Sequence, residues 1–112
     1  MDSSYSQLYG LRTPNLQVAS DEVGAILRVE WTLRNGLESG DYCTHGEFDS
    51  EFLSLYRNHN VWYNEPFEPK FADFPMLLYV RNTARSAELT TLLTQQNVTT
   101  FEIVLLYTKP TA

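Results

Sequence analysis

The most regular pattern of apolar and polar positions lies between residues 76 and 108. Residues 76–81 begin with a continuous apolar run of strand length, which is typical of a strand covered on both faces. A second strand is predicted over 99–108, where both alternating faces are mostly apolar, and leucines at helical spacing predict a helix over 86–96. The pattern therefore predicts a β-α-β unit. A parallel crossover and an antiparallel return are both open.

A second clear pattern lies between residues 25 and 48. Apolar and polar residues alternate over 25–34, which predicts a strand with one buried and one solvated face. Asn35 and Gly36 follow and signal a hairpin whose return strand runs over about 41–48. A two-residue turn would place two acidic side chains opposite each other, which favours a longer loop and leaves the register open.

The remaining segments predict one short helix and two irregular stretches. Asp49 is a predicted helix N-cap, and a helix is predicted over 50–58. Residues 1–20 read as a polar N-terminal arm, and prolines exclude regular structure from most of 58–75. The predicted fold is a single α+β domain over 21–112. Its mixed sheet has about four to five strands, an N-terminal hairpin plus the C-terminal β-α-β unit, and it carries two helices.

Composition and charge narrow the function classes. The chain has 112 residues, 43% of them apolar and 13% aromatic, which indicates one folded domain. Fourteen acidic and eight basic residues give a net charge of −6, and no basic stretch is present for direct binding to nucleic acid. Because no apolar run approaches the roughly 20 residues of a membrane helix and no signal peptide is evident, we expect a soluble intracellular, cytoplasmic protein without membrane contact.

The turn after the first strand of the β-α-β unit is a candidate anion site. It lies at the carboxyl end of a strand and the start of a helix, where open α/β sheets tend to bind ligands. Free backbone N–H groups, hydroxyls and two guanidinium groups could hold an anion there. The candidate residues are Arg81, Thr83, Arg85 and Ser86. Because the turn lacks the glycines of a phosphate loop, ordinary helix capping is the competing interpretation.

The predicted return strand carries potential metal ligands. Regular alternation would place Cys43, His45 and Glu47 on one face, where a metal site or a thiol–imidazole pair is conceivable. The neighbouring acids oppose the lowered thiol pKa that catalysis would need. A single cysteine also excludes an internal disulfide and a cysteine-based zinc site. We therefore predict no catalytic residue, no metal site and no cofactor, and we lean away from an enzyme.

Acidic and aromatic residues interleave through the middle of the chain. Acids supply a polar rim and electrostatic steering, and aromatic residues supply anchors, so the combination is typical of a protein-binding surface. The predicted surface contains Tyr42, Glu47, Asp49, Trp62, Tyr63, Glu65, Phe67, Glu68 and Phe71. The competing interpretation is that the aromatic residues form core and the acids are merely solvated.

The preferred function is that of a small acidic, non-catalytic interaction protein, such as an inhibitor, an immunity or accessory protein, or an assembly subunit. Its expected partner is a protein that is basic or binds nucleic acid, because a net negative surface complements such a protein. The alternative is a small-ligand-binding or enzymatic domain that uses the anion site. Homo-oligomerisation through a sheet edge is a further route.

Overall fold

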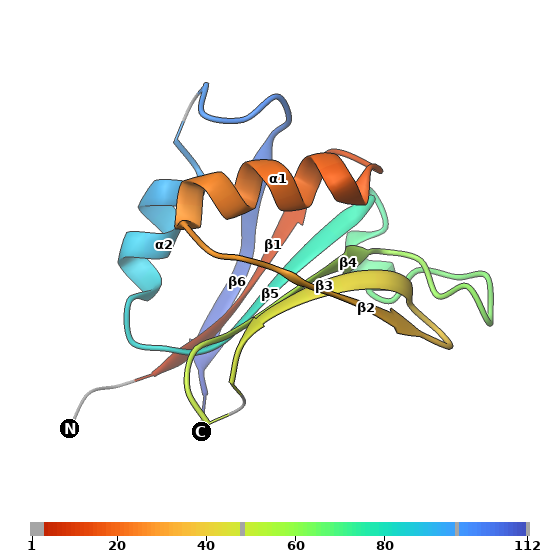
Figure 1. Cartoon of the computed structure of the whole chain (residues 1–112), viewed down its shortest axis with the longest axis horizontal. Coiled ribbons are helices and arrows are strands. Elements are labelled where there is room, and N and C mark those ends of the chain that lie inside the picture. The colour runs from red at the N-terminus through yellow and green to blue at the C-terminus, as the bar shows by residue number, and fades with distance from the viewer. Residues whose placement is uncertain (1–3, 48, 96, 112) are drawn as a thin grey trace.

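The computed structural model describes residues 4–47, 49–95 and 97–111. In this described part, six strands form one sheet and two α-helices pack against it (Figure 1). The elements in chain order are β1 (Tyr5–Leu11), α1 (Leu16–Leu27), β2 (Thr32–Gly36), β3 (Gly40–Gly46), β4 (Phe52–Arg57), the short 3-10 helix η1 (Pro69–Phe71), β5 (Met76–Thr83), α2 (Ser86–Leu93) and β6 (Ile103–Pro110).

The strand order is β2-β3-β4-β5-β1-β6, and every neighbouring pair is antiparallel. The α+β class is thus confirmed. The expected mixed sheet of four to five strands is wrong, because the sheet has six strands and is wholly antiparallel.

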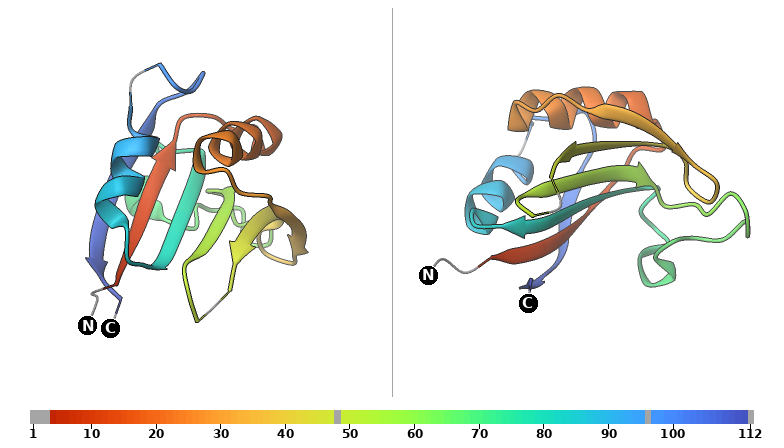
Figure 2. Two further views of the ribbon diagram at one scale, coloured as in Figure 1. Left: turned by 60° about the vertical axis from the view of Figure 1, so that its left-hand side comes forward. Right: turned by 60° about the horizontal axis from the view of Figure 1, so that its bottom comes forward.

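Both helices lie on the same face of the sheet, and the main hydrophobic core fills the space between them and the strands (Figure 2). Alternate strand residues supply this core, because successive side chains of a strand point to opposite faces. Fully buried members of the core include Tyr9, Leu11, Val23, Leu53, Leu55, Met76, Leu78, Val80 and Leu89. The opposite face of the sheet is therefore left for other contacts.

Within the predicted arm over 1–20, the described residues are not an arm: residues 5–11 form strand β1 of the sheet, and residues 16–20 begin helix α1. Strand β1 lies between β5 and β6, in the interior of the sheet. Its polar Gln7 is buried because the side-chain amide donates to the hydroxyls of Thr90 at 3.0 Å and Thr108 at 3.2 Å, and its oxygen accepts from Tyr9. Thr90 and Thr108 are remote from Gln7 in sequence, so a local pattern could not reveal these two partners.

The predicted strand over 25–34 is wrong in its first part. Helix α1 continues to Leu27 and ends at Arg28, which adopts a left-handed φ of 56°. Val23 and Leu27 are four residues apart and share the buried face of α1, so Leu27 fits a helical pattern as well as an alternating one. Only the end of the predicted segment forms strand β2.

The β-α-β unit is present as β5, α2 and β6. Both strands pair antiparallel with β1, so they run in the same direction, and β1 inserts between them to give a split β-α-β arrangement. The register between β1 and β6 shifts at Leu106, so the strict alternation expected along β6 is interrupted. Tyr107 pairs with Leu8 and thereby faces away from the helices, opposite to Leu105.

Residues 52–57 form strand β4, and the predicted helix over 50–58 is wrong. Leu53 and Leu55 face the helices, whereas the alternate residues Phe52, Ser54 and Tyr56 face the other side of the sheet. Asp49 is exposed and precedes no helix. Because β4 lies between β3 and β5 and is apolar on both faces, its apolar pattern resembles that of a helix.

The predicted hairpin is confirmed as β2–β3, and its register is now defined. Gly36 pairs with Gly40, which leaves a three-residue loop over 37–39. Gly40 has a φ of 66°, the left-handed conformation that closes such a loop. Asn35 lies within β2, opposite Asp41, so the Asn-Gly pair is not the turn itself.

Residues 58–75, here called the covering segment, pack on part of the sheet face opposite the helices (Figure 2). Phe74 is buried against Gly10 of β1, where an added Cβ would lie 2.5 Å from the ring. Asn58 is buried and donates to the Phe71 carbonyl at 3.0 Å, which ties the covering segment to the end of β4. The covering segment is thus partly core, and it leaves the same face open over β2, β3 and β4.

Candidate functional site

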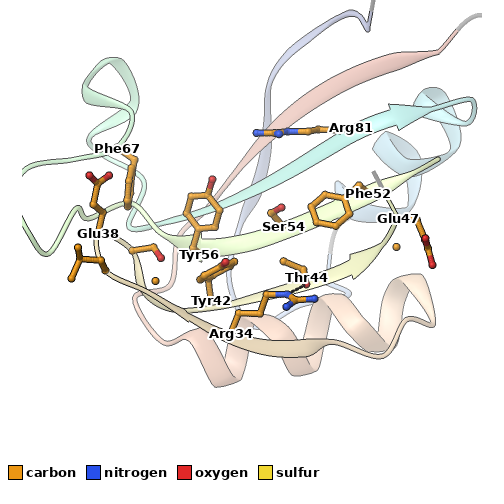
Figure 3. A pocket seen from close by; sticks show the side chains of 14 residues that line it. Arg34, Glu38, Tyr42, Thr44, Glu47, Phe52, Ser54, Tyr56, Phe67 and Arg81 are labelled. Atoms are coloured by element: carbon orange, nitrogen blue, oxygen red, sulfur yellow. Dashed lines mark hydrogen bonds between the residues drawn. The ribbon is translucent and has the colours of Figure 1, made fainter. Parts of the chain in front are cut away.

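A cleft of about 960 Å³ lies on this open part of the sheet face (Figure 3). Strands β2, β3, β4 and β5 and the β2–β3 loop supply most of its lining, and the covering segment supplies Phe67. The side chains that shape it are Arg34, Glu38, Tyr42, Thr44, Glu47, Phe52, Ser54, Tyr56, Phe67 and Arg81.

The floor of the cleft is formed by two short hydroxyl side chains. Thr44 of β3 and Ser54 of β4 are directly paired across the strands. In the next pairs on the same face, Tyr42 stands opposite Tyr56, and Gly46 stands opposite Phe52. The floor is therefore a low region between aromatic rings, and the ring-bearing positions on β4 are about 13 Å apart at a strand rise of about 3.3 Å per residue.

An aromatic cluster forms one wall of the cleft. The ring of Tyr56 meets Tyr42 edge-on at 5.8 Å and Phe67 at 5.6 Å, and it stacks on Tyr79 at 5.3 Å between centroids. The Tyr79 hydroxyl donates to Glu68. Burial raises the pKa of both Tyr56 and Tyr79, so both phenols stay neutral at neutral pH. The wall is therefore a connected set of uncharged aromatic rings.

Two guanidinium groups border the floor. Arg34 of β2 donates from Nε to the Thr44 hydroxyl at 2.8 Å. Arg81 of β5 is paired with Phe52 across the strands and lies 6.0 Å from the Tyr79 ring centroid. Figure 3 shows the two arginines on opposite sides of the cleft. Among the described residues, no carboxylate lies within salt-bridge distance of either guanidinium.

Beside the cleft, two loop tips carry exposed apolar side chains. Leu37 is 72% exposed, and Val61, Trp62 and Tyr63 are 49%, 61% and 63% exposed. The Val61 amide donates to the Glu38 carbonyl at 2.7 Å, which joins the β2–β3 loop to the covering segment. We call these four residues, 37 and 61–63, the tip surface.

A buried asparagine fixes the shape of the tip surface. The Asn60 side-chain oxygen accepts from the backbone amides of Trp62 and Tyr63, both at 3.0 Å. The backbone N–H of Asn60 also donates to the Glu65 carbonyl at 2.7 Å. The two exposed rings therefore project from a turn whose backbone is held in one shape by hydrogen bonds.

The predicted acidic–aromatic surface is divided between these two places. Tyr42, Glu47 and Phe67 line the cleft, and Trp62 and Tyr63 belong to the tip surface. The other members are spread out: Asp49 and Glu65 are exposed, Phe71 is half-buried in η1, and the Glu68 carboxylate is bound to Tyr79. Partner binding by these residues remains a prediction.

Two residues of the predicted anion turn, Thr83 and Arg85, converge on a carboxylate of the chain itself, Glu51. Arg85 is bound to Glu51 through two nitrogens, and the hydroxyl of buried Thr83 also donates to Glu51 at 2.7 Å. Arg81 lines the cleft instead. An anion at this turn would have to compete with the Glu51 carboxylate, so anion binding there remains a prediction without added support.

The potential metal ligands of β3 are separated. Cys43 is buried in the core, where burial raises the pKa of its thiol. His45 Nδ1 lies 2.8 Å from the Glu30 carbonyl, whereas Glu47 follows Gly46 and lines the cleft on the other face. Within the described ranges, no group of three or more His, Cys, Asp or Glu side chains could hold a metal ion.

Sequence reasoning missed several cleft residues, among them Arg34, Thr44, Phe52, Ser54 and Tyr56. Alternation over β4 was the available signal, because a strand there places positions 52, 54 and 56 on one face. Pairing β4 with β3 then brings the hydroxyl residues together, which requires knowledge of the sheet order.

In the described part of the chain, neither helix is long and apolar enough to cross a membrane. No protein-family model matches the chain, and no curated protein matches it either.

Proposed function

We propose that the protein acts by binding a partner protein, without catalysis, and that the tip surface is the centre of the contact. The observation that carries this proposal is the exposure of four large apolar side chains on two hydrogen-bonded loop tips. Exposed apolar side chains that are grouped in this way are a feature of interaction sites.

The two rings of the tip surface have the properties of binding anchors. Trp and Tyr dominate the energy of many interfaces, because each buries a large ring at a small cost in side-chain entropy. Asn60 holds the backbone of Trp62 and Tyr63 before binding, so less ordering is needed when the partner arrives. This arrangement favours recognition by a preformed surface.

Charge around the tip surface favours a basic partner. Glu38 and Glu65 are exposed beside it, and among the described residues neither forms a salt bridge. The chain as a whole has a net charge of −6. Negative charge beside an apolar centre steers a basic protein toward the site, and salt weakens that steering.

The experiment uses the full chain as bait in lysate of its source organism, beside the double variant Trp62→Ala/Tyr63→Ala. Val98→Ala is the matched control, because it removes an exposed apolar side chain from a different loop. Proteins enriched by the wild type are identified by mass spectrometry, and binding of the purified partner is then measured at two salt concentrations. Size-exclusion chromatography of the pure chain shows whether the partner is a second copy.

We expect the double variant to lose about 2 kcal/mol or more of binding energy, and the control to bind as the wild type does. Higher salt should weaken the wild-type complex. The proposal fails if a folded double variant captures the same proteins with the same affinity. It also fails if the wild type enriches no protein over the double variant.

A further inference from the structure

We propose that the cleft is a second binding site, which meets the tip surface at Leu37, and that it takes a small molecule with a planar aromatic ring system and one anionic group. The inference rests on the aromatic walls, the hydroxyl floor and the two arginines of the cleft that have no carboxylate partner among the described residues. It does not depend on the proposed protein partner.

The shape of the floor selects a flat ligand. Thr44 and Ser54 are short, and the paired position beyond them on β3 is Gly46, which has no side chain. Aromatic rings stand on both sides, with Tyr42 and Tyr56 toward one end of the strands and Phe52 toward the other. The backbone positions of these rings on β4 are about 13 Å apart, and the short Ser54 lies midway, so a fused pair of rings can lie on the floor between them.

The hydroxyl groups of the floor provide directional contacts. Among the described residues, no side chain or backbone group is hydrogen-bonded to the Ser54 hydroxyl. Every buried side-chain oxygen among the described residues has a hydrogen-bond partner. Since the Ser54 hydroxyl has none, it is accessible, and Ser54 lines the cleft. Thr44 accepts a hydrogen bond from Arg34 and still has its own hydrogen to donate. Both groups can therefore bond to polar atoms on the edge of a ligand.

The charges of the cleft select a single anionic group. Among the described residues, Arg12 and Arg85 have carboxylate partners, and the other arginines have none. Of these, Arg34 and Arg81 line the same cleft. Two long guanidinium side chains on opposite sides can reach one anion over the floor.

The acids of the cleft argue against a highly charged ligand. Glu38 and Glu47 line the cleft at its two ends, and the chain carries a net charge of −6. A polyanion such as a nucleic acid would meet this repulsion along its length. A compact monoanion between the arginines avoids it, and its rings can contact the faces and edges of the tyrosine and phenylalanine side chains.

The test is a titration of the full chain followed by backbone amide chemical shifts in NMR. The probes are naphthoate, its neutral amide naphthamide, and acetate, which has the charge without the rings. Naphthyl phosphate distinguishes a phosphate from a carboxylate as the preferred anion. We expect naphthoate or naphthyl phosphate to bind at millimolar concentration or below, with the largest shifts at Thr44, Ser54 and their neighbours.

Three variants separate the charge of the cleft from the charge of the chain. Arg34→Gln and Arg81→Gln each remove one guanidinium from the cleft and should weaken the aromatic anion about tenfold. Arg28→Asn removes the same charge at the end of α1, on the other face of the sheet, and asparagine tolerates its left-handed φ of 56°. This control should bind as the wild type does.

The inference is overturned if naphthamide binds as tightly as the aromatic anions, or if acetate alone produces the same shifts. It is also overturned if both cleft variants, shown to be folded by their spectra, bind as the Arg28→Asn control does. Shifts confined to residues outside the cleft, or no shifts at millimolar probe, would likewise exclude the site.

Discussion

Arg85 binds Glu51 with both sides of its guanidinium, Nε to Oε1 at 2.9 Å and Nη2 to Oε2 at 2.7 Å. The pair joins the start of β4 to the start of α2, and Glu51 is only 26% exposed. Glu51→Ala should therefore lower the free energy of unfolding by about 1–2 kcal/mol. The matched control is Glu102→Ala, which breaks an exposed pair with Arg12 and should cost less than about 0.5 kcal/mol. Equal losses in denaturant titrations would contradict this ranking.

The same pair predicts an acid-dependent loss of stability. Hydrogen bonds from Arg85 lower the pKa of Glu51 below its ordinary value. A carboxyl group with a lower pKa in the folded state stabilises the fold above its unfolded pKa of about 4.3, and this contribution disappears as pH falls through the folded value. Below about pH 4, stability should therefore fall more steeply in the wild type than in Glu51→Gln. Parallel curves of unfolding free energy against pH would refute the assignment.

Regions with local periodicity were the predictable part of this fold. The β5-α2-β6 unit combines a long apolar run with a leucine stripe, so its elements follow from short stretches of sequence. Strand β1 was missed because Gln7 and Gly10 look unsuited to a central strand. The Gln7 side-chain amide is satisfied by Thr90, Thr108 and the Ser86 carbonyl, all remote in sequence, and Gly10 is required because Phe74 lies on it.

The candidate cleft was predictable only in part for a related reason. Tyr42 and Phe67 could be predicted because aromatic side chains are common in binding sites, and both line the cleft. Thr44 and Ser54 are ordinary residues until β3 and β4 pair and place them together. Strand register and sheet order, which create the cleft, are long-range properties that one sequence does not reveal.

The covering segment should loosen when Asn58 is replaced. The Asn58 side chain accepts from the Glu68 amide at 2.9 Å and donates to the Phe71 carbonyl at 3.0 Å. Asn58→Ala should cost about 1–3 kcal/mol, because buried backbone groups lose their partners. Asn58→Asp keeps the acceptor and loses the donor, so it should protect the Glu68 amide from hydrogen exchange better than alanine does. Unchanged exchange at Glu68 in both variants would contradict this role.

Buried tyrosines predict a second loss of stability at alkaline pH. Burial raises the pKa of Tyr79, which also donates to Glu68, and burial raises the pKa of Tyr56 as well. A phenol whose pKa is raised in the folded state stabilises the fold below its unfolded pKa of about 10, and this contribution is lost as pH rises further. Tyrosinate absorbance above pH 10 should therefore rise together with unfolding.

Tyr79→Phe tests this alkaline prediction directly. The variant lacks one buried ionisable phenol, so its stability should fall less steeply above about pH 10 than that of the wild type. Tyr63→Phe is the control, because its ring is exposed on the tip surface. If Tyr79→Phe and Tyr63→Phe show the same slope of unfolding free energy against pH, the buried phenol does not set the alkaline limit.

Asn60 provides a test of whether the tip surface must be preorganised. Its side chain bonds to the amides of Trp62 and Tyr63, and it is itself buried, so it offers little to a partner directly. Asn60→Ala leaves both rings in the sequence and removes the bonds that order them, together with the 3.5 Å hydrogen bond from the Asn60 side chain to the Glu38 carboxylate. If the proposed partner recognises a preformed surface, its affinity should fall about tenfold, because the turn must then be ordered on binding.

Hydrogen exchange makes this last prediction decisive. In Asn60→Ala, the amides of Trp62 and Tyr63 should exchange faster in the free protein. The Glu68 amide, which is bonded to the Asn58 side chain, should exchange as slowly as in the wild type. Asn60→Asp keeps the accepting oxygen and should restore both the slow exchange and most of the affinity. Faster exchange with unchanged affinity would show that the partner binds the rings without a preformed turn, and the energetic advantage attributed to Asn60 would then be absent.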